Sequence, residues 1–463
     1  MCGIAGVYKS PYASTYAYLL IYSLQHRGQE SVGISSSDGK EIFTVKKAGR
    51  VLEAIKREDI ESLKGEMAIA HVRYSTSGSS GGANAQPIVK ETPIGKVAVV
   101  HNGNLVNFLS LRKELEAKGV KFEYNSDSEL FLSLLGEDTF VPEGINLHPE
   151  DREILPYIFH VLRRVKGAYS LLYMVGDKLI AIRDPYGFRP LCVGRKGNTI
   201  LFASESCAFE IVEAEFWREI YPGEVFVVDK KGIRSYRAFT SPKKAMCVFE
   251  FVYFARPDSY IFGNWVYAVR KEMGRQLARE DNLEADIVIP VPDSGVVPAL
   301  GYAEEKGIPF DYGLIRNHYV GRSFIEPTQE LRNLRVLMKL SPNRAVLEGK
   351  RVVVIDDSLV RGTTSKRIIA MLRRAGAKEV HLRIASPPVF GPCYYGIDTP
   401  TKEELIANRM SLEEIGKFIG ADSLRYLSLE GLRKVVGNWE DFCDACFSLN
   451  YPVEVEDLKL VSV

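Results

Sequence analysis

The chain has 463 residues, and 60 Lys and Arg balance 59 Asp and Glu to give a formal net charge of +1. Hydrophobic residues make up 46% and charged residues 26%, which excludes a disordered chain, a collagen-like chain and a globally basic nucleic-acid coat. The length predicts two or three domains. Apolar runs stay below the ~18–20 residues that cross a bilayer, and we read residues 18–22 as a core helix. We therefore expect a cytoplasmic protein with no membrane partner.

The predicted elements fall into two regions that differ in how strands and helices follow one another. Up to about residue 235, short strands (67–72, 97–100 and 170–175) and a helix (108–118) indicate layered, largely antiparallel sheets. Beyond residues 241–244, strands alternate with amphipathic helices, as in strand 287–290 with a helix to 305, and strand 352–355, helix 365–375 and strand 380–384. This alternation predicts βαβ units and a parallel sheet. The predicted fold is α/β, with domains at residues 2–235 and 245–463.

Cys2 is the first candidate nucleophile. Removal of Met1 would leave Cys2 with a free α-amine, whose reference pKa of ~7.7–8 lets it accept the thiol proton without a separate histidine. The alternative is that Cys2 is an ordinary small residue. Five ordered motifs bear on this choice: CGIAG at 2–6, HRGQE at 26–30, HVRYST at 71–76, HNGN at 101–104 and SDSE at 126–129.

These motifs resemble the glutamine amidotransferase domain of the N-terminal-nucleophile family. The resemblance implies an αββα glutaminase domain that hydrolyses glutamine at Cys2 through a thioester and releases ammonia. The Asn102 side chain and the Gly103 N–H are suited to an oxyanion hole, Arg73 to the α-carboxylate of glutamine, and Asp127 to its α-ammonium. We interpret His26, His71 and His101 as structural histidines rather than as members of a papain-like Cys/His pair.

Residues 352–365 read VVVIDDSLVRGTTS, a buried strand that ends in two acids and a loop that opens a helix. A helix N-terminus binds anions, and Asp356 and Asp357 at a strand's carboxyl end suit ribose hydroxyls or Mg²⁺. A solvated acid pair is the alternative. The stretch resembles the phosphoribosyl pyrophosphate (PRPP) motif of type I phosphoribosyltransferases. The resemblance implies one Mg²⁺ per subunit near Ser294, Asp356 and Asp357, and a PRPP site built from these residues and Asp293, Gly295, Ser358, Arg361, Gly362, Thr363 and Thr364.

The two halves together resemble the amidophosphoribosyltransferase family, and the words CVFEFVYFARPDS at 247–259 and RNHYVGRSFI at 316–325 agree. The resemblance implies that glutamine and PRPP give 5-phosphoribosylamine, pyrophosphate and glutamate in purine synthesis. It also implies inhibition by purine nucleotides and a homodimer or homotetramer. A glutamine-dependent sugar-phosphate aminotransferase and a non-catalytic PRPP-binding regulator are the rival hypotheses. Residues 333–341 depart from the family pattern.

Four of the seven cysteines form a candidate metal site: Cys247, Cys393 and the CxxC pair Cys443 and Cys446. Four thiolates suit Zn²⁺ or [4Fe–4S]. In the family's cysteine-containing branch, similar contexts hold a [4Fe–4S] cluster, so we expect one structural cluster per subunit. Cys192 and Cys207 are predicted to be buried apolar residues.

Residues 316–383 carry 15 Lys and Arg against six acids. We take this basic region as a site for a small polyanion rather than nucleic acid or an ordinary solvated face. Residues 316–339 are a candidate lid over PRPP, and a permanently ordered helix is the alternative.

Overall fold

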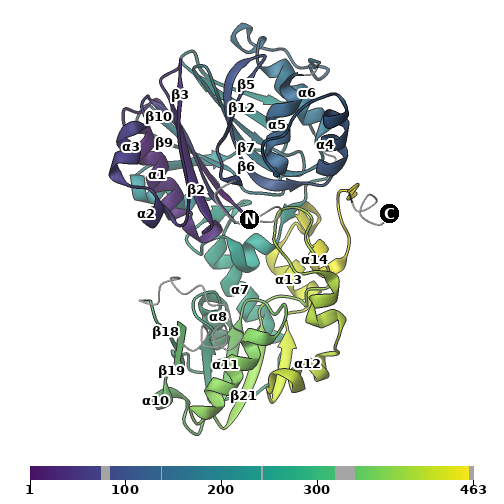
Figure 1. Ribbon diagram of the computed structural model, residues 1–463. Coiled ribbons are helices and arrows are strands. Elements are labelled where there is room, and N and C mark those ends of the chain that lie inside the picture. Colours follow the sequence, from purple (N-terminus) through teal and green to yellow (C-terminus); the bar gives the residue numbers. More distant parts are fainter. Residues whose placement is uncertain (75–83, 137, 241–242, 319–338, 458–463) are drawn as a thin grey trace.

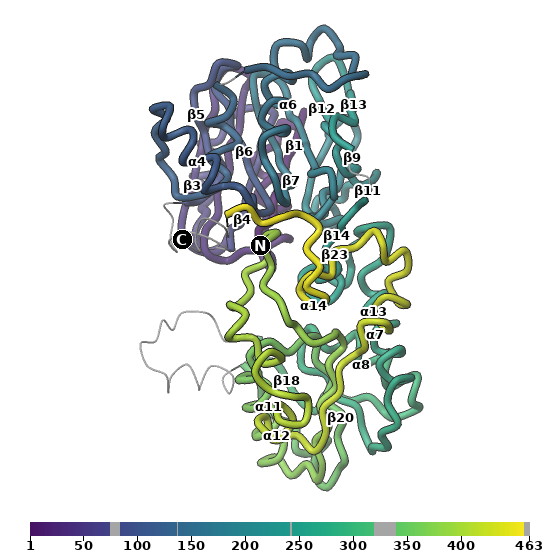
Figure 2. The backbone as a smooth tube through the Cα atoms, turned by 90° about the vertical axis from the view of Figure 1, so that its right-hand side faces the viewer, coloured from purple at the N-terminus to yellow at the C-terminus, as the bar shows by residue number. Residues whose placement is uncertain are grey.

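The computed structural model describes residues 1–74, 84–136, 138–240, 243–318 and 339–457. Two bodies are stacked along the long axis of the molecule (Figure 1), and the C-terminal segment runs between them (Figure 2). Most of the predicted lid, residues 319–338, and most of the atypical stretch 333–341 lie outside the described residues. No described helix combines the length and the apolar composition that membrane crossing demands.

The first body is a four-layer αββα sandwich, as the sequence predicts. Its seven-stranded antiparallel sheet runs β11 (Glu215–Glu219), β9 (Cys192–Lys196), β10 (Thr199–Ala203), β1 (Gly3–Tyr8), β4 (Met67–Arg73), β2 (Ser31–Ser37) and β3 (Ile42–Ala48). Its six-stranded antiparallel sheet runs β13 (Gly232–Arg237), β12 (Glu224–Asp229), β8 (Lys178–Arg183), β7 (Gly167–Val175), β6 (Gly95–Leu105) and β5 (Ile88–Thr92). Apolar side chains of both sheets interleave between the two, among them Ile4, Ile69, Val100 and Leu172.

Helices cover the outer face of each sheet. The first sheet is covered by α1 (Ala13–Ser23), α2 (Val51–Ala54) and α3 (Arg57–Ser62), and the second by α4 (Phe108–Ala117), α5 (Leu130–Ser133) and α6 (Leu155–Arg164). The predicted core helix at 18–22 belongs to α1, and the predicted helix 108–118 is α4. Cys192 and Cys207 are buried, as predicted.

The second body is built on a parallel sheet of four strands, which also confirms the prediction. The strand order is β17 (Ile287–Pro290), β20 (Arg351–Asp356), β21 (Glu379–Ile384) and β22 (Ser423–Tyr426). Its helices are α7 (Val266–Arg279), α8 (Val296–Lys306), α10 (Arg344–Leu347), α11 (Thr363–Arg374), α12 (Leu412–Ile419), α13 (Leu429–Val436) and α14 (Ala445–Ser448). A single run of four apolar residues makes β20 a central strand that is buried on both faces.

Short two-stranded sheets complete this body. They pair β14 (Met246–Cys247) with β23 (Phe442–Cys443), β15 (Tyr260–Ile261) with β16 (Asn264–Trp265), and β18 (Leu314–Arg316) with β19 (Leu340–Pro342). The β14–β23 register sets Cys247 opposite Cys443, so two segments far apart in the chain meet at the predicted metal site.

Candidate active sites

Cys2 lies immediately before β1, at the end of the first sheet that faces the second body. Its backbone N–H donates to Asn102 Oδ1 (3.3 Å), and its thiol donates to the Tyr74 carbonyl (3.9 Å). The Arg27 Nε donates to the Cys2 carbonyl (3.0 Å). These contacts hold the cysteine backbone on two sides and leave the half-buried thiol at the mouth of the site.

Asn102 lies on β6 and is fully buried. Its Oδ1 is taken by Cys2, while its Nδ2 has no hydrogen-bond partner among the described residues. An unpaired buried donor costs about 1–3 kcal/mol, and an oxygen of a bound substrate would satisfy it. Gly103 follows on the same strand, so its N–H and the Asn102 amide group lie in adjacent residues beside the nucleophile.

Arg73 and Asp127 flank this position. The pairing of Gly3 with Val72 in the first sheet brings Arg73, at the end of β4, alongside Cys2. Asp127 is buried in a 3-10 turn, where its Oδ2 accepts the Leu105 N–H (3.0 Å). Burial acts to raise the pKa of Asp127, but the neighbouring His101 outweighs it and lowers that pKa. Asp127 is therefore an anion, as binding of an ammonium group requires.

The histidines behave as structural residues. Burial and the nearby Arg73 lower the pKa of His71 to about 3, and its Nε2 is hydrogen-bonded to the His101 carbonyl (3.2 Å). His26 Nε2 is hydrogen-bonded to Glu205 Oε1 (2.7 Å). Among the described residues no imidazole shares a hydrogen bond with the Cys2 thiol, which favours the structural interpretation over a Cys/His pair.

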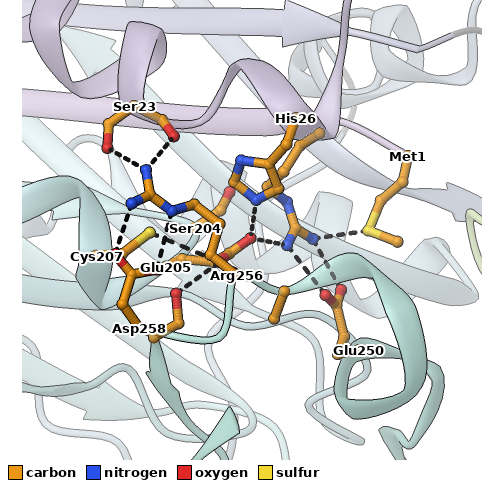
Figure 3. Close-up of polar contacts among 12 residues, drawn as sticks. Met1, Ser23, His26, Ser204, Glu205, Cys207, Glu250, Arg256 and Asp258 are labelled. Carbon is orange, nitrogen blue, oxygen red and sulfur yellow. Dashed lines mark hydrogen bonds and ion pairs between the residues drawn. The ribbon is translucent and has the colours of Figure 1, made fainter. Parts of the chain in front are cut away.

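A buried ion-pair network lies behind the nucleophile (Figure 3). Arg27, which holds the Cys2 carbonyl, pairs with Glu205 (2.5 Å) and through Nη2 with Glu250 (2.8 Å), and all three side chains have no exposed surface. Met1 Sδ accepts from the same guanidinium (2.7 Å). Sequence reasoning missed Glu205 and Glu250. Glu250 lies within the segment 247–259, but its partner Arg27 is 223 positions away in the chain.

The predicted PRPP residues gather at the carboxyl end of β20, in a cavity of about 480 Å³, a size that suits a small-molecule ligand. Its lining includes eight of the ten: Ser294, Asp356, Asp357, Ser358, Arg361, Gly362, Thr363 and Thr364. Helix α11 starts at Thr363, so its free N–H groups point into this cavity as an anion site. Asp293 and Gly295 do not line it, and Asp293 pairs with Arg316 instead.

The two acids fit a divalent cation. Burial raises the pKa of both carboxyls, and the charge of Asp357 raises the pKa of Asp356 further, to well above its usual value. Asp357 also accepts a hydrogen bond from Ser358 (2.5 Å). Within the described residues, no group of three or more His, Cys, Asp or Glu converges on one point. Mg²⁺ suits this arrangement, because it commonly takes one or two carboxylates and completes its shell with water and phosphate oxygens.

Residues that sequence reasoning did not select link the two sites. Tyr253 and Asp398 both line the PRPP cavity. Burial raises the pKa of Tyr253, and the charges of Asp357 and Asp356 and the Tyr74 phenol add to the increase. Tyr253 therefore lies within electrostatic reach of both the acid pair and the segment that contacts Cys2.

All four predicted cluster cysteines line one small, mostly enclosed cavity, together with Phe188, Arg189, Phe249, Tyr395, Ile397, Thr399, Ala445 and Tyr451. Burial raises the pKa of Cys247 to about 11 and those of Cys443 and Cys446 well above their usual range. The thiolates that bind metal are thus disfavoured until a cation is present. Four cysteines that line one cavity could hold either a zinc ion or an iron–sulfur cluster.

Two family profiles match the chain, one described as a glutamine amidotransferase domain over residues 71–210 and one as a phosphoribosyl transferase domain over residues 266–385. The first profile covers Arg73, Asn102, Gly103 and Asp127 and begins beyond Cys2, and the second covers Ser294, Asp356 and Asp357. The fold and the two sites therefore define a glutamine amidotransferase joined to a phosphoribosyltransferase.

Relatives that match nearly the whole of this chain identify the family within this class. The chloroplastic amidophosphoribosyltransferase 1 of Arabidopsis thaliana is 50% identical over 99% of this chain and 80% of its own length. The amidophosphoribosyltransferase of Methanocaldococcus jannaschii is 48% identical over all of this chain and 99% of its own length. The chain belongs to the amidophosphoribosyltransferase family. It is an enzyme of the first committed step of purine biosynthesis, the transfer of the glutamine amide nitrogen to PRPP.

Solved structures agree with the fold. The chain superposes on glutamine PRPP amidotransferase from B. subtilis, a structure solved with ADP and GMP, with a TM-score of 0.89, 44% identity and 98% coverage of both chains. A second structure, described as the allosteric regulatory enzyme of purine biosynthesis, gives a TM-score of 0.90 at 44% identity, with 98% of this chain and 97% of that chain covered.

Proposed function

We propose that residues 2–235 hydrolyse glutamine at Cys2 and that residues 245–463 use the released ammonia to displace pyrophosphate from PRPP. The observation that carries the glutaminase assignment is the divided role of Asn102. Its Oδ1 holds the Cys2 backbone nitrogen, and its buried Nδ2 is left for a substrate oxygen.

In the glutaminase step, which requires prior removal of Met1, the α-amine of Cys2 accepts the thiol proton, and the sulfur attacks the glutamine amide carbon. Asn102 Nδ2 and the Gly103 N–H stabilise the resulting oxyanion, each donor contributing ~10²–10³ in rate. The protonated α-amine returns its proton to the leaving nitrogen, so collapse of the intermediate expels ammonia and leaves a thioester, which water hydrolyses to glutamate. Arg73 binds the substrate carboxylate and Asp127 its ammonium group.

In the transfer step, the N-terminus of α11 with Gly362, Thr363 and Thr364 holds the 5-phosphate. Asp356, Asp357 and Ser294 would hold the ribose and one Mg²⁺, which would supply positive charge to the pyrophosphate leaving group. Ser358 and Arg361, which line the same cavity, complete the proposed PRPP contacts, and Asp293 and Gly295 flank Ser294 in the chain without lining the cavity. Neutral ammonia reaches this site without release to solvent, where it would be protonated.

Two variants test the division of labour. Cys2→Ala should abolish glutamine-dependent synthesis and leave ammonia-dependent synthesis within about twofold, because the oxyanion chemistry and the PRPP site use different residues. Asp357→Asn should lose synthesis with both nitrogen sources. Equal loss of both activities in Cys2→Ala would contradict the proposal, as would wild-type ammonia-dependent rates in Asp357→Asn.

We also propose that Cys247, Cys393, Cys443 and Cys446 hold one [4Fe–4S] cluster per subunit, which ties the C-terminal segment to the rest of the chain. Anaerobically purified protein should contain about four irons per chain. Cys443→Ser should lose the iron, and Cys192→Ala, at a buried cysteine outside the cavity, should keep it. Stoichiometric zinc without iron would reverse the assignment.

The relatives are also the basis for two proposals, one on regulation and one on oligomeric state. Because a relative was solved with ADP and GMP, we propose feedback inhibition by purine nucleotides, tested by inhibition of synthesis with AMP and GMP. We propose a homodimer or homotetramer, and light scattering at micromolar concentration should give two or four times the 51.9 kDa chain mass.

A further inference from the structure

A loop of the second body touches the strand that carries the proposed oxyanion donors. Gly396 has φ +103°, and a Cβ built there would stand 2.9 Å from the Gly103 carbonyl carbon, 3.0 Å from its oxygen and 3.1 Å from its Cα. Real Cβ atoms essentially never show the first of these distances, and the other two are tighter than nine in ten real Cβ contacts. The Gly396 and Gly103 backbones are therefore in direct contact, with no side chain between them.

Hydrogen bonds to the two residues before Gly396 fix this contact. Asn104 Nδ2, from the oxyanion strand, donates to the Tyr394 carbonyl (2.9 Å). The fully buried Arg189 donates twice to the Tyr395 carbonyl, through Nε (2.9 Å) and Nη2 (2.6 Å). The Tyr395 ring stacks on Phe188, with centroids 4.4 Å apart. Three consecutive residues of the loop are thus held against the glutaminase body.

The same loop also reaches the nucleophile through buried charges. Arg189 Nη1 donates to Glu250 (3.3 Å), and Glu250 accepts two hydrogen bonds from Arg27. Arg27 in turn donates to the Cys2 carbonyl. The loop therefore supports both halves of the glutaminase site, the oxyanion strand by direct contact and the nucleophile through Arg189, Glu250 and Arg27.

We propose that Gly396 and Asn104 are positioning residues of the glutaminase reaction. Together they set where the Gly103 N–H and the Asn102 side chain stand when charge develops on the substrate oxygen. This inference rests on the oxyanion roles proposed above for Asn102 and Gly103. It adds that a loop of the phosphoribosyltransferase half, which also carries Cys393, completes the geometry of the other active site.

The test compares two variants that act from opposite sides of the contact. Gly396→Ala inserts a methyl group against the Gly103 backbone, and Asn104→Ala removes the hydrogen bond to Tyr394 without adding bulk. Each should lower kcat for glutamine hydrolysis by about 10- to 100-fold with KM within threefold, since a misplaced oxyanion donor acts mainly on the transition state. Ammonia-dependent synthesis and the rate of Cys2 alkylation by iodoacetamide, which needs no oxyanion hole, should stay within twofold.

Two controls separate the possible failures. Gly420→Ala places a side chain at a similar backbone angle (φ +79°) with no atom within 4 Å, and should change none of these rates. Asn102→Ala is the benchmark, with an expected loss of ~10²–10³ in kcat. If Asn102→Ala leaves kcat unchanged, the proposed oxyanion hole is wrong. If Asn102→Ala lowers kcat while Gly396→Ala and Asn104→Ala stay within twofold of wild type, or if both lose ammonia-dependent synthesis equally, the positioning role is overturned.

Discussion

Glu205 is a fully buried carboxylate whose partners come from distant parts of the chain. It pairs with His26 (2.7 Å) and Arg27 (2.5 Å) and accepts from the Ser259 hydroxyl (2.6 Å) and the Arg256 N–H (2.8 Å). Burial acts to raise the pKa of Glu205, but the charges of His26 and Arg27 outweigh it and hold that pKa well below its usual value. The carboxylate is therefore charged in the folded protein and is fully compensated.

We expect Glu205→Gln to lower the free energy of unfolding by about 3–5 kcal/mol, because it removes one partner of a buried ion pair and leaves Arg27 undercompensated. A carboxyl with a depressed folded pKa stabilises the fold above its unfolded pKa of about 4.5, and this stabilisation is lost as the pH falls. The difference between variant and wild type should therefore be full at pH 7 and shrink below about pH 4.5, measured by urea unfolding.

The control is the same substitution in an exposed pair. Glu61 meets Arg57 on the surface of α3 (2.6 Å), with side chains 58% and 87% exposed. Glu61→Gln should leave the urea midpoint unchanged at every pH. An equal effect of the two substitutions would refute the role assigned to burial.

Local motifs and distant partners differ in how far sequence predicts them. Cys2, Asn102 and Asp357 lie in short sequence motifs whose chemistry is recognisable without a structure. Glu205 and Glu250 lack such a signal, because their roles depend on Arg27, 178 and 223 positions earlier. Asp398 likewise joins the PRPP cavity only through folding.

At the scale of elements, the hydrophobic patterns predicted the strands and helices around both sites. Helix α11 begins at Thr363 rather than at the predicted residue 365, because Gly362 adopts a left-handed conformation (φ +76°) that starts the helix earlier. This shift matters for function, since it moves Thr363 and Thr364 to the helix N-terminus that faces the cavity.

The close approach of helices α7 and α8 cannot be predicted from the periodicity of their hydrophobic residues. A Cβ at Gly301 would stand 1.9 Å from the Lys271 carbonyl oxygen, so the two helices approach through this glycine. Gly301→Ala gains about 1 kcal/mol of helix propensity but forces the helices apart, which typically costs 1–3 kcal/mol or more. We expect a net loss of about 1–2 kcal/mol in urea unfolding.

A glycine in another helix gives the matched control. In α12 a Cβ at Gly416 would meet only Leu424, at an ordinary 3.7 Å. Gly416→Ala should therefore stabilise the protein by about 0.5–1 kcal/mol. A gain in both variants would mean that α7 and α8 are not held at this separation.

At the scale of the whole molecule, the C-terminal segment leaves the second body and reaches the glutaminase body (Figure 2). On the way it provides Cys443 and Cys446, and the Val453 carbonyl accepts from the Tyr395 hydroxyl (2.6 Å). Its last described residue, Asp457, contacts α4, where it accepts from the Leu109 N–H (2.9 Å) and the Ser110 N–H (3.2 Å). Sequence patterns predicted the cysteines but not this path, because the contacts of Asp457 with α4 join residues more than 340 positions apart.

Asp457 thus does for α4 what an N-cap side chain does, although it comes from the other end of the chain. The helix has no side-chain cap of its own. Asp457→Ala should cost about 1 kcal/mol locally and speed amide hydrogen exchange at Leu109 and Ser110 about fivefold, while glutamine-dependent synthesis stays unchanged. Asp457→Asn keeps one acceptor oxygen and should give a smaller increase. Glu456→Ala removes only the neighbouring ion pair with Lys166 and should leave both amides as they are. Unchanged exchange at these two amides in Asp457→Ala would show that α4 does not depend on the C-terminal segment.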